Sequence, residues 1–146
     1  MGTLKGKTAI ITGGGRAVLS DGSCGSIGYG IATAYAKEGA NLVITGRNVK
    51  KLTDAKEELE EKYGIRVLPV QADISAGADN EALVESVAKQ AMDAFGRIDV
   101  LINNAQASAS GVTLADHTTE QFDLAVYSGL YATFHYEGML SIFERN

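Results

Sequence analysis

The hydrophobic positions along the chain alternate between short apolar runs and longer segments with helical spacing. Short apolar runs bounded by glycine or polar residues are typical of buried strands. The runs occupy residues 7–13, 41–46, 66–73 and 98–105. Segments whose apolar residues recur every three or four positions predict amphipathic helices. These segments lie at 28–39, 48–63, 79–95 and from residue 118 onward.

Local signals place the ends and faces of these helices. Glycines at 39, 64 and 96 follow the first three helical segments, which is a helix-terminating signal. Thr118 and Gln121 have the spacing of a capping box and predict the start of the last helix. The first helix is expected to carry Ile31, Ala34 and Tyr35 on one face. The last helix is expected to carry Phe122, Val126, Leu130 and Phe134.

The alternation of strands and helices sets the topology. Short loops between alternating strands and helices predict a parallel sheet that helices cover, and right-handed crossovers leave few strand orders. We expect an α/β fold with a doubly wound parallel sheet in the order 3-2-1-4. Pro69 supports this order because proline cannot donate to a ladder and belongs on an edge strand, which here is the third.

Bulk properties exclude several functional classes. A chain of 146 residues predicts one domain. A net charge of −5 argues against a general nucleic-acid partner. No apolar run approaches the roughly 20 residues that span a bilayer, so no membrane partner is expected. The single cysteine, Cys24, permits no internal disulfide, and we expect a cytoplasmic protein.

A glycine-rich stretch, TGGGRAVLSDGSCGSIGYG at 12–30, joins the first strand to the first helix. Glycines there allow close approach of the backbone to a pyrophosphate, and a helix N-terminus offers free N–H groups to it. Gly13 at the strand end, with Ser26, Ile27 and Gly28 at the helix start, fits this role. The position between strand and helix favours a nucleotide site over a simple tight turn.

Several motifs together resemble the short-chain dehydrogenase/reductase family. They are Thr-Gly at 12–13, Ile-Gly at 27–28, Gly-Arg at 46–47, Ala-Asp at 72–73 and GRIDVLINNA at 96–105. The resemblance covers residues 5 to about 135, and the last motif is its most specific part. It implies a Rossmann-like dinucleotide-binding domain and, in full-length relatives, hydride transfer between NAD(P)(H) and a carbonyl or alcohol.

The resemblance also assigns cofactor contacts. Asp73 matches the acid beside the adenine, and Asn104 and Ala105 match the ribose contacts. Arg47 stands where NAD-binding folds usually hold an acid, and Arg16 is a second candidate for the same phosphate. Because an arginine binds a 2′-phosphate, we favour NADP(H) over NAD(H). The complete set of expected cofactor-binding residues is Gly13, Arg16, Ser26, Ile27, Gly28, Arg47, Asp73, Ile74, Asn104 and Ala105.

The chain departs from the family pattern at three places. Nine extra residues, 17–25, interrupt the glycine loop and form either an inert surface excursion or a lid over the pyrophosphate. Cys24 within them is either a reactive thiol or a plain small residue. Gln106 replaces the glycine of the NNAG motif, beside the expected nicotinamide position. Gly129 stands where the family has a helical asparagine.

The family's catalytic residues have no counterpart here. Its Tyr-x-x-x-Lys pair is missing because none of the six tyrosines has a lysine four positions later, and no catalytic or metal-binding residue is assigned. We therefore expect residues 1–146 to form one NAD(P)-binding Rossmann-like domain, truncated at its C-terminal end. The alternatives are a non-catalytic nucleotide-binding module and a non-functional remnant. An uncovered fourth strand predicts self-association or a homo-oligomer.

Overall fold

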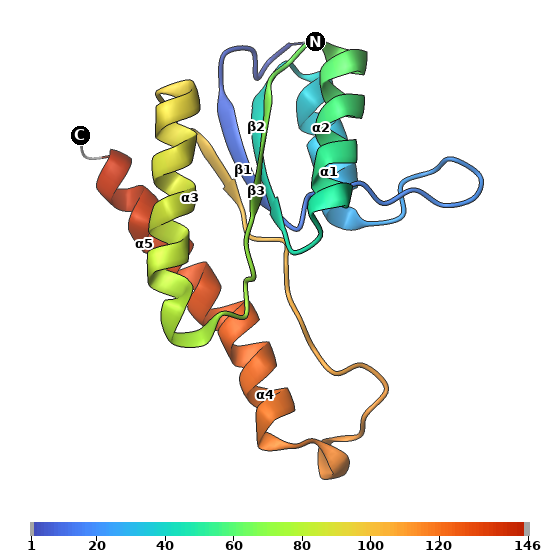
Figure 1. Ribbon diagram of the computed structural model, residues 1–146, viewed down its shortest axis with the longest axis vertical. Helices are drawn as coiled ribbons and strands as arrows, with labels where there is room; N and C mark the ends of the chain where they lie inside the picture. The colour runs from blue at the N-terminus through green and yellow to red at the C-terminus, as the bar shows by residue number, and fades with distance from the viewer. Residues whose placement is uncertain (1, 145–146) are drawn as a thin grey trace.

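The computed structural model describes residues 2–144, apart from the side chains of residues 78, 143 and 144. Within this range a parallel sheet with the order β3-β2-β1-β4 lies between two layers of helices, which confirms the predicted fold class (Figure 1). The elements are β1 (Thr8–Thr12), α1 (Ile27–Lys37), β2 (Asn41–Gly46), α2 (Val49–Tyr63), β3 (Val67–Gln71), η1 (Gly77–Asp79), α3 (Asn80–Phe95), β4 (Val100–Ile102), η2 (Leu114–Asp116), α4 (Thr119–Ala125), η3 (Val126–Tyr131) and α5 (Ala132–Glu144).

The two faces of the sheet have separate cores. Ala9 and Ile11 of β1 face α1 and α2, whereas Ile10 between them faces α3 and α5. All three side chains are fully buried. Both faces of β1 are therefore covered, as expected for a central parallel strand. Burying a side chain of the size of isoleucine stabilises the fold by about 1.5–3 kcal/mol.

The predicted boundary signals lie where the sequence places them. Gly64 and Gly96 end α2 and α3 in the left-handed conformation, with φ of 65° and 72°. Thr118 Oγ1 accepts from the Gln121 N–H at 3.2 Å, and the Gln121 side chain accepts from the Thr118 N–H at 3.0 Å. Pro69 lies on the edge strand β3, opposite Ile44 of β2. Local chemistry therefore sets these helix ends and supports the strand order.

The buried face of α1 differs from the predicted one. Tyr29, Ala32 and Ala36 are buried, whereas Ala34 is exposed and Ile31 is only partly covered. The two buried alanines lie four residues apart on one side of the helix, and their small side chains let α1 approach the sheet closely. The buried face is thus the one that carries Gly28, where the helix approaches the backbone of Gly13 most closely.

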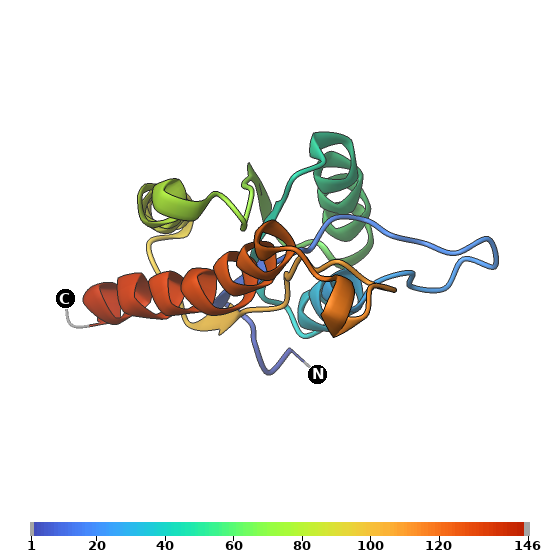
Figure 2. The same ribbon diagram turned by 90° about the horizontal axis from the view of Figure 1, so that it is seen from below.

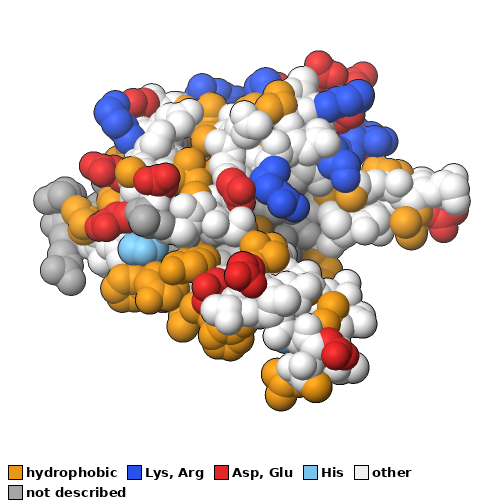
Figure 3. Space-filling view, turned by 60° about the horizontal axis from the view of Figure 1, so that its bottom comes forward, with side chains coloured by type: hydrophobic (Ala, Val, Ile, Leu, Met, Phe, Trp, Pro, Cys, Tyr) orange, Lys and Arg blue, Asp and Glu red, His pale blue; other side chains and the backbone are white. Residues whose placement is uncertain are grey.

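The last predicted helix is interrupted, and most of its predicted apolar face, apart from the partly buried Val126, is exposed. The π-helix η3 lies between α4 and α5, and the buried positions are Ser128, Ala132 and Tyr136. Ser128 Oγ donates to the Leu124 carbonyl at 2.7 Å and accepts from the Ala107 N–H at 2.9 Å. These bonds turn Ser128 inward. The side chains left largely exposed are Phe122, Leu130 and Phe134, and Figure 3 shows hydrophobic side chains gathered on one side of the molecule.

Candidate functional site

The glycine loop holds the end of β1 against the start of α1. Gly13 has a φ of 73°, and its N–H donates to the Thr45 carbonyl at 2.9 Å. A β-carbon at Gly28 would lie 2.0 Å from the Gly13 carbonyl oxygen, so this position accepts no side chain. Ser26 caps α1 by accepting from the Tyr29 N–H at 3.4 Å. The N-terminus of α1 therefore lies directly beside the strand end.

The nine inserted residues form a hairpin of their own. Val18 and Cys24 pair in an antiparallel bridge, and the Gly25 N–H donates to the Ala17 carbonyl at 2.7 Å. Both ribbon views show this hairpin extending away from the sheet (Figures 1 and 2). Cys24 is exposed. Because its ends meet, the insertion leaves the strand end and the helix start close together.

Thr12 joins the ends of β1 and β4. Its Oγ1 accepts from the N–H groups of Asn104 and Ala105, each at 3.0 Å. The Asn104 side-chain amide donates to the Thr12 carbonyl at 2.9 Å, and a β-carbon on Gly13 would lie 2.9 Å from the same amide nitrogen. Asn104 therefore fixes the strand ends, in addition to the cofactor contact that the resemblance implies.

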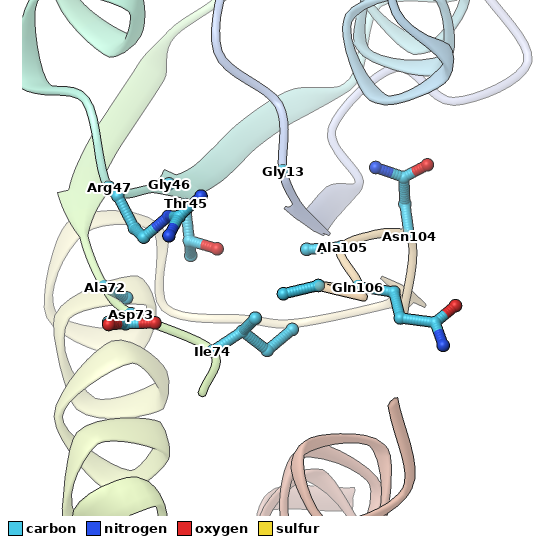
Figure 4. A pocket seen from close by; sticks show the side chains of 11 residues that line it. Gly13, Thr45, Gly46, Arg47, Ala72, Asp73, Ile74, Asn104, Ala105 and Gln106 are labelled. Atoms are coloured by element: carbon cyan, nitrogen blue, oxygen red, sulfur yellow. The ribbon is translucent and has the colours of Figure 1, made fainter. Parts of the chain in front are cut away.

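Two cavities open at the carboxyl ends of the strands. The first has a volume of about 300 Å³, with Arg47 and Asp73 at one end and Asn104 and Gln106 at the other (Figure 4). The second, of about 620 Å³, shares Gly13, Gly46 and Arg47 with the first. The second cavity is lined by Gly13, Gly15, Ala17, Ser26, Gly46, Arg47, Asn48, Lys51 and Leu52. Crevices at this edge of a doubly wound sheet are where such folds bind nucleotides.

Positive charge surrounds the second cavity. Arg47 is exposed, and Lys51 stands in the first turn of α2. Asn48 caps this helix by accepting from the Lys51 N–H at 3.0 Å, so the helix N-terminus also lies at the cavity. A helix N-terminus carries partial positive charge. The second cavity is therefore suited to a phosphate group.

Asp73 is a carboxylate at the edge of the first cavity. Its Oδ1 accepts from the Ser75 N–H at 2.9 Å and from the Ser75 hydroxyl at 2.7 Å. These bonds, with a smaller contribution from the charge of Arg47, hold the pKa of Asp73 below its usual value. The side chain therefore presents an ionised hydrogen-bond acceptor to the cavity at neutral pH.

Most of the residues expected to bind the cofactor meet at these cavities. The first cavity is lined by Gly13, Arg47, Asp73, Ile74, Asn104 and Ala105 from that set. Ser26 lines the second, and Gly28 packs against Gly13. Arg16 and Ile27 line neither: the Arg16 guanidinium binds Glu58, and the Ile27 side chain is 76% exposed.

The expected set omits some residues that line the cavities. Asn48 directly follows Arg47, and Lys51 lies one helical turn later at the start of α2; this closeness to Arg47 is the signal that could have identified them. Gln106 lines the first cavity as well. A β-carbon at Gly129 would lie 3.2 Å from the Gln106 side-chain nitrogen. Two of the three departures from the family pattern, Gln106 and Gly129, are therefore neighbours in the fold.

Among the side chains that the structure describes, no group of three or more His, Cys, Asp and Glu is arranged to hold a metal ion. No helix within residues 2–144 has both the length and the apolar character needed to cross a bilayer.

A glycine loop before a helix and a crevice at the strand ends define a dinucleotide-binding α/β protein. The short chain dehydrogenase profile matches residues 7–141, and the chain belongs to this family. It is 60% identical over 136 residues to a 12alpha-hydroxysteroid dehydrogenase of Clostridium sp., covering 93% of this chain and 50% of that protein. The chain spans about half the length of the curated relatives it matches.

Solved structures agree with this assignment. L-sorbose reductase of Gluconobacter frateurii, complexed with NADPH and L-sorbose, superposes with a TM-score of 0.81 at 30% identity and covers 97% of this chain and 49% of its own. A short chain dehydrogenase of Burkholderia cenocepacia in complex with NADP gives 0.81 at 27% identity, with 95% and 51% covered. These relatives support the binding of NAD(P) by this fold.

Proposed function

We propose that the chain binds NADP(H) in preference to NAD(H) in the two joined cavities. In this proposal it is the cofactor-binding part of an oxidoreductase that transfers hydride between NADP(H) and a carbonyl or alcohol. The observation that carries the proposal is Arg47, which lines both cavities beside Lys51 and the N-terminus of α2. Folds of this class that select NAD place an acid at this point, which would repel a 2′-phosphate.

The remaining residues divide the cofactor among them in this proposal. The glycine loop and the α1 N-terminus, through Gly13, Ser26 and Gly28, receive the pyrophosphate. The adenine lies beside Asp73 and Ile74, at one end of the first cavity. The ribose contacts are assigned to Asn104 and Ala105, Ile27 contributes its backbone at the helix start, and Arg16 is a second phosphate ligand.

None of these residues is assigned as the proton donor or the base for the hydride-transfer reaction. None of the six tyrosines has a lysine four positions later, so we expect no turnover from residues 1–146 alone. The 60% identity to a 12alpha-hydroxysteroid dehydrogenase supports a hydroxysteroid as the substrate class of a complete enzyme that contains this half. Turnover by the 146-residue chain in an NADPH oxidation assay would refute this division of labour.

Substitution of Arg47 tests the cofactor preference. Hydrogen bonds to charged groups contribute about 1.5–3 kcal/mol, which corresponds to roughly 10–150-fold in affinity. We expect NADPH to bind more tightly than NADH in a fluorescence titration, and Arg47→Asp to reverse that order. Lys89→Asp is the matched control, because Lys89 is exposed on α3, across the sheet from α2. Equal affinities that Arg47→Asp leaves unchanged would contradict the proposal.

A further inference from the structure

Glu58 on α2 is the centre of a charged cluster. Its two carboxylate oxygens accept separately from Arg16 Nε and Lys62 Nζ. The Tyr29 phenol of α1 lines the same small cavity as Glu58, and burial raises the pKa of this phenol, so it stays protonated. The bonds from Lys62 and Arg16 lower the pKa of Glu58 to about 2. Glu58 therefore stays ionised and binds two cationic side chains, one at each carboxylate oxygen.

This cluster turns Arg16 away from the phosphate cavity. Gly15 and Ala17, the residues on either side of Arg16, both line the second cavity, whereas Arg16 does not. The Arg16 N–H donates to the Lys51 carbonyl at 2.8 Å, so its backbone lies at the cavity wall. Glu58 lies seven residues further along α2, which is about 10 Å along a helix. The Arg16 side chain thus follows α2 away from its N-terminus.

We propose that Glu58 is a specificity-determining residue. It binds Arg16 as long as no 2′-phosphate is present, and this competing ion pair limits the preference for NADPH over NADH. The inference rests on the proposed function. When a 2′-phosphate occupies the cavity, Arg16 exchanges Glu58 for the phosphate. Lys62 remains on the carboxylate after the exchange, so Glu58 is not left without a partner. NADH offers no 2′-phosphate and leaves the pair intact.

The charge-neutral variant Glu58→Gln tests this exchange. It weakens the ion pair with Arg16 while keeping the side-chain shape, so we expect NADPH to bind about two- to fivefold more tightly and NADH to bind as before. Glu61→Gln is the matched control, since it removes the same charge from an exposed position of the same helix. Adding Arg16→Ala to Glu58→Gln should abolish the gain.

Three results would overturn the inference. They are unchanged or weaker NADPH binding by folded Glu58→Gln, an equal gain for NADH, and an equal gain from Glu61→Gln. If Glu58→Gln does not fold by circular dichroism, the wild-type chain still decides: the NMR signal of Arg16 Nε–H should move on addition of NADPH but not of NADH, and an unmoved signal refutes the exchange. If the Glu58 inference fails but Arg47→Asp reverses the cofactor preference as expected, the proposed function still stands. If the chain does not bind NADPH at all, the proposed function and the Glu58 inference are both refuted.

Discussion

Gly28 is the position where a single methyl group should disturb both the fold and the site. A β-carbon there would lie 2.0 Å from the Gly13 carbonyl oxygen and 2.6 Å from the Asn104 side-chain nitrogen. Ordinary contact begins near 3.4 Å, so relief needs α1 to move by more than about 1 Å from the strand end. Overpacking typically destabilises a protein by 1–3 kcal/mol. Because the nearest obstacle is backbone, we expect about 3 kcal/mol for Gly28→Ala.

Gly30→Ala is the matched control in the same helix. A β-carbon at Gly30 meets nothing closer than the Cys24 β-carbon at 4.0 Å. Alanine is favoured over glycine in a helix by about 1 kcal/mol, so this variant should be slightly more stable than the wild type. Urea denaturation followed by circular dichroism measures both variants. Equal stabilities, or a Gly28→Ala variant as stable as the wild type, would refute the close-approach argument.

Three further predictions follow from the hairpin, an ion pair and the open sheet edge. Deleting residues 17–25 should shift the Tm by less than about 4 °C, because Ala17 and Gly25 already meet; a collapse of the circular dichroism signal would contradict this. Hydrogen bonds from Arg97 lower the pKa of Asp99 to about 2, so its ion pair stabilises the fold above pH 4 and is lost as the pH falls toward 2. Asp99→Asn should remove this acid dependence, about 1 kcal/mol after solvent screening, in urea titrations across that range. The 146-residue chain should self-associate through β4 and the exposed apolar side chains, and light scattering that shows only monomer would refute this.

The sequence predicted the fold because its main signals are local. Gly64, Gly96 and the Thr118 capping box act within a few residues of the helix ends that they specify. The alternation of strands and helices then leaves few sheet orders, and Pro69 favours one with β3 at the edge. Similar local reasoning placed Gly13 and Arg47 at the carboxyl end of the sheet, because each directly follows a strand, and both line the first cavity.

Features that depend on distant partners could not be predicted. Arg16 matches a phosphate ligand by position, but Glu58 binds it from 42 residues away. Gln106 and Gly129 are two unrelated departures from the family pattern in the sequence. They become neighbours only after η3 packs beside the segment that follows β4. The buried side of α1 depends on how closely the helix approaches the sheet, which the spacing of apolar residues does not encode.

The hydrogen bonds of the Thr12 hydroxyl couple the local unfolding of two segments, the glycine loop and the end of β4. The hydroxyl accepts from the N–H groups of Asn104 and Ala105 and donates to the Ile102 carbonyl, at 3.4 Å, so its hydrogen-bonding capacity is full. The glycine loop and the β4 end are thus tied through one atom, although 92 residues separate Thr12 from Asn104. Local unfolding of the glycine loop or of the β4 end must break the same bonds, so the two segments form one cooperative unit. Their amide protons should therefore exchange with solvent together.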